Sequence, residues 1–284
     1  MDAMRLPPCR PSRRESGRNM MKWYRFLARH RHLVLIFEAV LCVILLYIFD
    51  HELSIPFFLC LLLTYLPVVA VALYATFSVN KWTFLLEKQM QDVCDPYPLY
   101  EEMTDLLMHH KRPKGEEKAL LMNQACALSR MGEYRNAYAI LTSFNPDERP
   151  KLNPINRLIY TNNLFDIAML CGYFDHADAL YTDMKTQYDR LPPSASKSRL
   201  EDAMKGNEIL MFFRRGDYRT VLHLLEERTP KNRCAAVEQA FLGAKACLAL
   251  GDTEGARSRL DFVVREGNRL GFVAEAKAIL ETLS

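Results

Sequence analysis

Residues 33–80 contain neither lysine nor arginine, and this stretch constrains the fold more than any other feature of the chain. Within it, residues 33–49 carry one charge, that of Glu38, and residues 55–77 carry none. Since a helix rises about 1.5 Å per residue and a bilayer core is about 30 Å thick, both stretches can cross a membrane. The short connection between them makes the two helices antiparallel neighbours. We therefore expect a transmembrane hairpin over residues 33–80.

The charges that flank the hairpin predict its orientation. Residues 1–32 contain nine basic and two acidic residues, Lys81 and Lys88 follow the second span, and the turn from Asp50 to Glu52 has no lysine or arginine. Because basic flanks stay on the cytoplasmic side, we expect an integral protein of the cell (inner) membrane with both termini in the cytoplasm. A cleaved signal peptide is the rival interpretation of the first span, but a small-x-small cleavage site near Asp50 is missing.

The basic segment 1–32 explains the positive net charge of the chain. Residues 81–284 hold 28 basic and 29 acidic residues, so the charge gives no reason to expect nucleic acid as a partner. Residues 1–19 are rich in proline and arginine without a helical or strand period, and we expect them to be disordered. One hypothesis is that the natural start is Met20 or Met21.

The chain has eight cysteines without a C-x-x-C motif or regular spacing. Most of those outside the predicted spans lie in apolar helical patterns, where a free cysteine acts as a small hydrophobe. We expect reduced thiols, which suits a cytoplasmic domain.

A turn recurs four times after the hairpin, and every segment around it has helical period. Glycines 132, 172, 216 and 251 are 40, 44 and 35 residues apart, a spacing typical of stacked helix pairs. Each glycine is expected to end a helix with positive φ, with an acidic residue in the first turn of the next helix. Those acidic residues are Glu133, Asp175, Asp217 and Asp252. Five residues after the glycines come the compact residues Ala137, Ala177, Val221 and Ala256, and nine after them come Leu141, Tyr181, Leu225 and Leu260.

The first of these turns, Gly132-Glu-Tyr134-Arg-Asn-Ala137, resembles the Gly-x-Tyr-x-x-Ala turn of the tetratricopeptide (TPR) family. The small residue that the family places seven positions before the turn is matched by Ala125 and Ala244, but not by Phe165 and Ile209. Inserts at 145–154 and 191–199 lengthen the middle repeats. Over residues 116–284 the resemblance implies a TPR-like α-solenoid of about four helix pairs with a C-terminal capping helix at about 270–283. Residues 81–115 are expected to form linking helices, so the predicted class is all-α.

The resemblance also implies protein binding on the concave surface formed by the first helix of each pair. Positions ten and six residues before each turn glycine give Met122, Cys126, Asn162, Asp166, Gly206, Leu210, Phe241 and Lys245. TPR domains that clamp acidic C-terminal peptides use lysine and asparagine at such positions, and only Lys245 and Asn162 fit. We therefore expect this surface not to hold a terminal carboxylate in that manner.

Sequence motifs for catalysis or nucleotide binding are missing from the chain: it has no G-x-x-x-x-G-K-[ST], G-x-G-x-x-G, G-x-S-x-G or H-E-x-x-H. The pairs His109–His110 and His223/Glu226 offer two ligands each, which is too few for a specific metal site. We therefore expect no enzyme activity, no cofactor, no metal and no small-molecule substrate.

These observations favour a membrane-anchored scaffold or assembly factor for protein–protein interactions, with residues 33–77 in the lipid bilayer. An alternative is an accessory or chaperone subunit of a membrane transport or secretion complex, in which the hairpin packs on other membrane helices. A third class, an enzyme with an unrecognised site, lacks a nucleophile and base at a plausible spacing.

Overall fold

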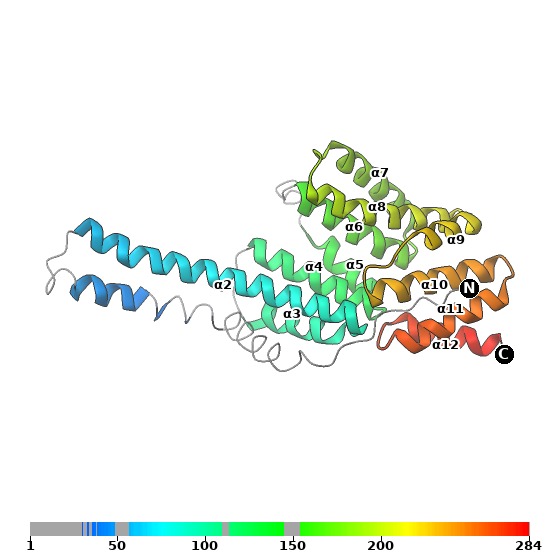
Figure 1. Ribbon diagram of the computed structural model, residues 1–284, viewed down its shortest axis with the longest axis horizontal. Helices are drawn as coiled ribbons and strands as arrows, with labels where there is room; N and C mark the ends of the chain where they lie inside the picture. The colour runs from blue at the N-terminus through cyan, green and yellow to red at the C-terminus, as the bar shows by residue number, and fades with distance from the viewer. Residues whose placement is uncertain are drawn as a thin grey trace. The chain divides into compact units, whose positions relative to one another are not determined.

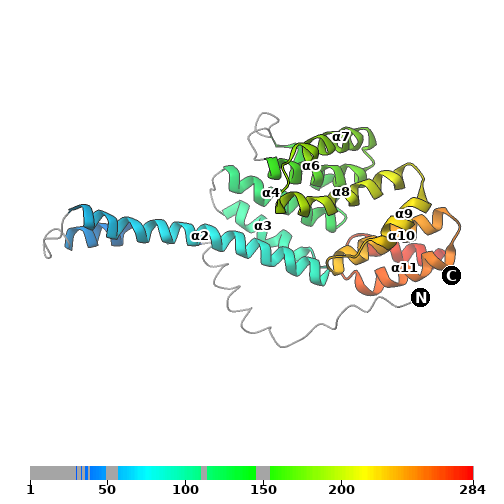
Figure 2. The ribbon, with the colours of Figure 1, turned by 45° about the horizontal axis from the view of Figure 1, so that its top comes forward.

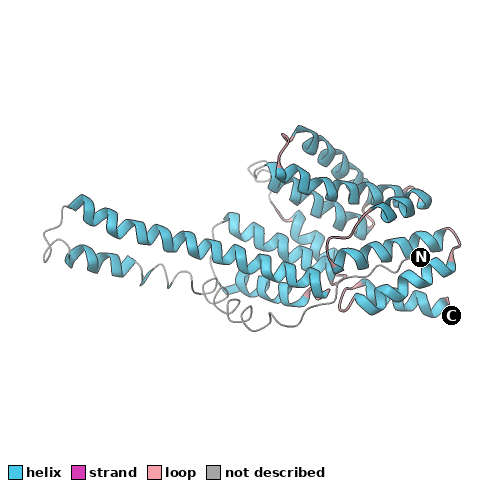
Figure 3. Cartoon of the chain, viewed as in Figure 1, coloured by secondary structure: helices cyan, strands magenta, loops and turns pink. Residues whose placement is uncertain are grey.

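The structure is a computed structural model that describes residues 30, 33, 36, 37, 39–48, 57–109, 114–144 and 154–283. All regular structure in this part of the chain is helical, which confirms the all-α prediction (Figure 3). The chain divides into two units, Met1–Glu87 and Lys88–Ser284, and the boundary falls within one helix. The labelled helices in Figure 1 are α2 (Phe57–Val93), α3 (Tyr97–His109), α4 (Lys114–Arg130), α5 (Tyr134–Thr142), α6 (Pro154–Cys171), α7 (Phe174–Arg190), α8 (Ala195–Arg214), α9 (Tyr218–Glu227), α10 (Arg233–Ala249), α11 (Thr253–Glu266) and α12 (Phe272–Thr282).

In the first unit, the described residues between 30 and 48 are helical, and α2 begins at Phe57. Large apolar side chains of this unit are exposed. They include Leu33, Ile36, Phe37, Val40, Val43, Ile44, Tyr47, Leu66, Leu73, Tyr74, Phe77 and Phe84.

Among the described residues, no helix combines the length and the apolar character needed to cross a membrane. The predicted spans 33–49 and 55–77 include residues 34, 35, 38, 49, 55 and 56, which lie outside the described part of the chain. The hairpin therefore stays a prediction. Within the predicted basic segment 1–32, the structure describes His30 alone. Residues 145–153 of the first predicted insert also lie outside the described part of the chain.

In the second unit, four glycines make the same turn between paired helices. The φ angles are +87° at Gly132, +75° at Gly172, +79° at Gly216 and +78° at Gly251, which confirms the predicted left-handed conformation. These turns join α4 to α5, α6 to α7, α8 to α9 and α10 to α11. A residue with a Cβ atom pays a steric penalty in this conformation, so glycine is favoured at all four positions.

The hydrogen bonds at these turns follow one pattern, shown here for the first. The Gly132 amide donates to the Ser129 carbonyl at 3.1 Å, and the Glu133 amide donates to the Leu128 carbonyl at 2.9 Å. This is the Schellman motif, which satisfies carbonyl groups that the end of a helix leaves unpaired. The bonds from Gly172 and Tyr173, from Gly216 and Asp217, and from Gly251 and Asp252 repeat it.

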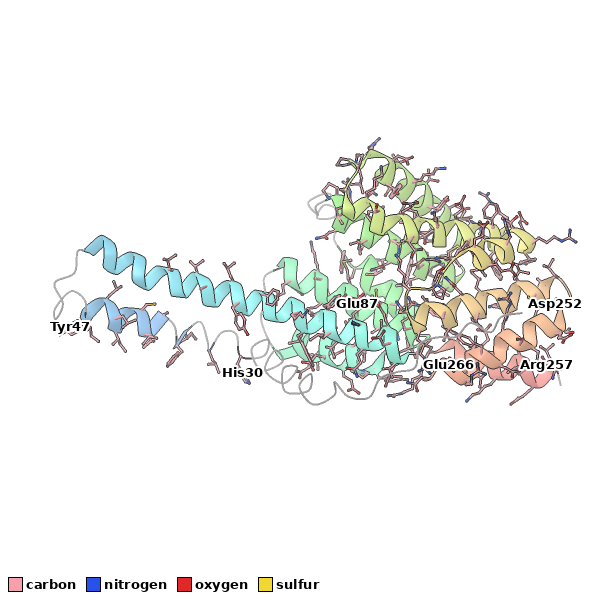
Figure 4. The ribbon with its side chains drawn as sticks, viewed as in Figure 1. His30, Tyr47, Glu87, Asp252, Arg257 and Glu266 are labelled. Atoms are coloured by element: carbon pink, nitrogen blue, oxygen red, sulfur yellow. The ribbon has the colours of Figure 1, made fainter. Side chains whose placement is uncertain are left out.

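The acidic residues at the turns differ in position from the prediction. Asp175 lies in the first turn of α7, as predicted. Glu133, Asp217 and Asp252 instead occupy the N-cap, the position immediately before the first residue of their helices. There the Asp217 side chain accepts a hydrogen bond from the Thr220 amide, and Asp252 accepts one from Gly255 at 2.9 Å. These two residues therefore cap their helices directly. Figure 4 shows Asp252 and Glu266 near opposite ends of α11.

The compact residues that follow the turns lie in the core. Ala137, Ala177, Val221 and Ala256 are all fully buried, which lets the paired helices approach closely. Of the larger residues four positions later, Leu141, Leu225 and Leu260 are buried, whereas Tyr181 is half-buried and Met184 takes the core position on α7.

Successive helix pairs share one core after another. One buried cluster joins α4 and α5 to α6, a second joins α6 and α7 to α8, and a third joins α8 and α9 to α10. The views in Figure 1 and Figure 2 agree that α6, α7 and α8 lie side by side. A fourth cluster contains residues of α10, α11 and α12 together with Cys94. Each pair thus buries its apolar face against the next, as in repeat proteins.

The last helices also contact the first pair and the end of α2. The Gly271 amide donates to the Arg130 carbonyl at 2.8 Å, and the Asn268 side chain donates to the Val93 carbonyl at 2.9 Å. The Arg130 guanidinium forms an ion pair with Glu238. These contacts join the two ends of the second unit.

Replacing Gly172 with alanine should lower the free energy of unfolding by about 1–2 kcal/mol, because alanine disfavours φ of +75°. A Cβ atom at this position would meet nothing within 4 Å. The loss of stability therefore measures the effect of the backbone conformation without a steric clash. Urea unfolding of the full chain in detergent measures it. Gly172→Asn is the matched control and should lose less, since asparagine tolerates this conformation; equal losses would contradict this explanation.

Replacing Gly271 with alanine should lower the free energy of unfolding by about 1–3 kcal/mol through steric overlap. The backbone conformation is not the cause, since the φ of Gly271 is −58°, a value that suits any residue. A Cβ atom there would lie 2.4 Å from the Met131 carbonyl oxygen and 2.5 Å from the Gly132 nitrogen. The comparison is Gly206→Ala within α8, whose Cβ would lie 3.1 Å from a guanidinium nitrogen of Arg228 rather than against backbone. Unfolding curves should show a smaller loss for Gly206→Ala, because a side chain can shift where backbone cannot, and a Gly271→Ala protein as stable as the wild type would contradict the close approach.

Candidate functional site

The residues predicted to line the binding surface occupy equivalent places on the first helices of the pairs. Two lie on each of α4, α6, α8 and α10, and all eight are half-buried. They are Met122, Cys126, Asn162, Asp166, Gly206, Leu210, Phe241 and Lys245. The two residues on each helix lie next to core positions such as Ala125 on α4 and Phe165 on α6. They therefore border the core on one side and solvent on the other.

The structure brings Asn162 and Asp166 together with Asn207, which the sequence did not single out. The Asn207 amide nitrogen donates to the Asn162 side-chain oxygen at 2.8 Å, and the Asn162 nitrogen donates to Asp166 Oδ2 at 3.2 Å. Asn207 is buried, with 3% of its surface exposed, and it also contacts the Met184 sulfur at 3.7 Å. We call Asn162, Asp166 and Asn207 the amide cluster. It links α6 to α8 through side chains whose polar groups satisfy one another.

Two arginines act on the amide cluster. Desolvation on burial raises the pKa of Asp166 to about 6, while the charges of Arg130 and Arg228 and the hydrogen bond from Asn162 oppose this increase. Arg228 is fixed by Asp202, since its Nε lies 3.2 Å from Oδ1 and a terminal nitrogen donates to the Asp202 carbonyl at 3.1 Å. The cluster thus contains a carboxyl group that changes charge near pH 6.

A second group forms at α10 and α12 around Phe241 and Lys245. The Phe241 ring stacks on Phe272 with centroids 4.7 Å apart, and the Lys245 ammonium lies 5.3 Å from the Phe241 ring centre. Lys245 also pairs with Glu275 at 3.1 Å. Both residues therefore contact the final helix of the chain. Of the remaining predicted residues, Met122 and Leu210 pack against two different core clusters.

No metal site was expected from the two pairs His109–His110 and His223/Glu226. Three or more His, Cys, Asp or Glu side chains suitably placed for a metal ion are not found among the described residues. His223 lies 3.4 Å from Glu227, and both side chains are largely exposed. His110 lies outside the described residues.

Sequence reasoning missed Asn207, Arg130 and Arg228. A signal was present for Asn207, because it interrupts an otherwise apolar helical pattern nine residues before Gly216. Arg130 and Arg228 lie at or just beyond helix ends, where charged residues are common, and only the tertiary arrangement brings their charges to Asp166.

Comparisons with models of known protein families, with curated proteins and with solved structures found no match to this chain.

Replacing Asp166 with asparagine tests the titration of this carboxyl group. Because its pKa is raised to about 6, the folded state binds the proton more tightly than the unfolded state does, and this contribution to stability is lost as the pH rises from about 4 to about 6. An asparagine keeps an acceptor for Asn162 and removes the charge. Urea unfolding should show that Asp166→Asn raises the free energy of unfolding above that of the wild type by more at pH 7 than at pH 4.5.

The matched control is Asp189→Asn on the same pair of helices, which removes an exposed carboxyl group outside the amide cluster and so reports the effect of the charge change alone. A difference between wild type and Asp166→Asn that is equal at the two pH values would show that this carboxyl group does not titrate in the range.

Proposed function

We propose that this chain is a membrane-anchored protein–protein interaction scaffold or assembly factor, in which residues 33–77 hold a TPR-like domain at the cytoplasmic face of the membrane. The observation that carries the proposal is the exposure of large apolar side chains in a stretch without basic residues. Phe37 is 69% exposed, Val43 67% and Leu73 66%. Soluble proteins rarely leave so many large apolar side chains of one stretch exposed to water.

Lipid is the solvent that suits this surface. A helix satisfies its own backbone hydrogen bonds, so apolar side chains can face the bilayer without leaving polar groups unpaired. Residues 55–77 include no charged side chain, and the basic residues lie on either side of the predicted hairpin. Both features favour insertion with the termini in the cytoplasm.

The second unit supports the binding half of the proposal. Four helix pairs with one turn geometry and linked cores resemble the modular organisation that TPR proteins use to present an extended surface. Confinement to the membrane would raise the effective concentration of such a surface for membrane partners. The proposal of protein binding follows the analogy between this repeat architecture and that family.

The contacts of Asn162 and Lys245 favour partners other than acidic C-terminal peptides. Asn162 is hydrogen-bonded to Asn207 and Asp166, and Lys245 is paired with Glu275. A terminal carboxylate would have to displace these partners and would also face the Asp166 carboxylate. We therefore propose that the domain recognises a part of its partner other than the C-terminus.

Membrane anchoring is tested by charge insertion. The double variant Val43→Arg/Leu66→Arg places one arginine within each predicted span, at a cost of about 2.5–3.5 kcal/mol per residue near a span centre. The full-length wild type should stay in the membrane pellet after alkaline carbonate extraction and dissolve in detergent, while a larger share of the variant is extracted. The control is Leu250→Arg, an exposed apolar residue of the second unit, which should behave as wild type.

A wild-type protein that carbonate releases without detergent would overturn the anchor. Binding is examined separately by crosslinking the full chain in cells and purifying it in detergent, with a second version in which residues 33–80 are replaced by an unrelated membrane hairpin. Stoichiometric partners recovered with both versions support the scaffold. Partners lost with the replaced hairpin would place the binding surface on the membrane helices instead, and recovery of none would oppose binding altogether.

A further inference from the structure

Two cysteines from distant parts of the sequence lie together in the core of the second unit. Cys94 follows the end of α2 and Cys234 is in the first turn of α10, and their exposed fractions are 0% and 2%. Both belong to the buried cluster that α10, α11 and α12 share, and their side chains are hydrogen-bonded to each other.

The backbone around Cys94 is held in place from several directions. The Arg269 amide donates to the Cys94 carbonyl at 3.1 Å, and the Asn268 side chain donates to the preceding carbonyl, that of Val93, at 2.9 Å. On the other side, Asn232 caps α10 and its amide nitrogen lies 3.3 Å from the Gln91 side-chain oxygen. Cys94 itself has φ of +56°, an uncommon value for a residue other than glycine. The two thiols are therefore positioned by contacts on both chain segments.

The surroundings of the two thiols shift their pKa values in opposite directions. The hydrogen bond from Cys94, and then the charge of Arg130, lower the pKa of Cys234 to about 7 against the opposing effect of burial. The same hydrogen bond, together with burial, raises the pKa of the Cys94 thiol. When protonated, Cys234 has the Glu238 carboxylate as an acceptor at 3.6 Å. Thiolate is the reactive form of cysteine, so Cys234 should react first with a small oxidant.

Cys171 and Cys247, two other cysteines of the second unit, lack this combination. Burial raises the pKa of the Cys171 thiol and that of the Cys247 thiol. Neither has a cysteine among the groups that shift its pKa, whereas Cys94 and Cys234 shift one another.

We propose that Cys94 and Cys234 are a redox-active pair that forms a reversible disulfide when a hydroperoxide reaches Cys234. The Cys234 thiolate attacks a peroxide oxygen and becomes a sulfenic acid, and the leaving oxygen departs as hydroxide or, once protonated, water. The Cys94 sulfur then attacks the sulfenic sulfur, forming the S–S bond and releasing a second water. Two thiols and one hydrogen peroxide thus give one disulfide and two waters, with two electrons passing to the peroxide. A dithiol reductant reverses the reaction by exchange.

The disulfide would join α2 covalently to α10. In the reduced protein hydrogen bonds and apolar packing hold these segments together, and the disulfide would add a covalent link at the C-terminal end of α2 for as long as the pair stays oxidised. Thiols are kept reduced in the cytoplasm, where disulfides are transient and serve in catalysis or sensing. The pair would therefore respond to oxidant rather than support the fold at rest. This inference holds whether or not the first unit enters a membrane.

Peptide mapping of the wild-type protein is the first test. The purified full chain in detergent is treated with hydrogen peroxide, denatured and alkylated, then digested without reductant for mass spectrometry. We expect a peptide pair linked through Cys94 and Cys234 that dithiothreitol separates. Both thiols alkylated after peroxide treatment, or Cys234 oxidised to sulfinic acid while Cys94 stays alkylated, would overturn the proposal.

Variants test the pairing independently of the wild type. Cys94→Ser should stop the crosslink and leave Cys234 as sulfenic or sulfinic acid, whereas the control Cys171→Ser should crosslink as wild type does. In thermal unfolding, peroxide should raise the Tm of wild type and of Cys171→Ser by about 5 °C or more, and dithiothreitol should reverse the rise. A Tm rise of the same size in Cys94→Ser would assign the effect to another group. Should Cys94→Ser fail to fold, the wild-type map alone decides.

Discussion

Reversal of the chain at four glycines with positive φ is the constraint on which the repeat unit depends. Each reversal closes a Schellman motif, and the small residue five positions later then lies against the preceding helix. With the pair closed in this way, its remaining apolar face is left for the next pair. One local backbone conformation, used four times, thus generates both the pairing of helices and the series of cores that joins them.

The features that the sequence predicted well are those set by residues close together in the chain. Gly132 and Ala137 define a turn and a buried position within six residues, and helical periodicity gave the all-α class. The chain breaks between α2 and α3 at Asp95-Pro96, and α3 begins at Tyr97, whose amide donates to the Asp95 side chain at 3.2 Å. The positions of the acidic caps differed by one residue because a hydrogen bond to the first free amides is satisfied best from just outside the helix.

The candidate site could be predicted only in outline. Counting back from the turn glycines placed eight residues on equivalent half-buried positions, because that count depends only on helix geometry. Their chemistry depends on neighbours that are far away in the sequence. Asn207 converts Asn162 and Asp166 into a network, and the charges of Arg130 and Arg228 come from the ends of other helices. No spacing rule connects such residues, so the amide cluster and the Cys94–Cys234 pair emerge only when the fold is known.

The hydrogen bond from Asn268 to Val93 joins residues 175 positions apart and has a consequence for biosynthesis. Chains grow from the N-terminus at about 5–20 residues per second, so the end of α2 leaves the ribosome many seconds before the segment that covers it exists. During that interval the groups around Cys94 stay exposed. The helix pairs already made can fold, but the contacts from Asn268 and Arg269 that cover the end of α2 cannot yet form. The earliest part of this unit to be made is therefore among the last to reach its final environment, and a prematurely terminated polypeptide would present an uncovered apolar surface to chaperones and proteases.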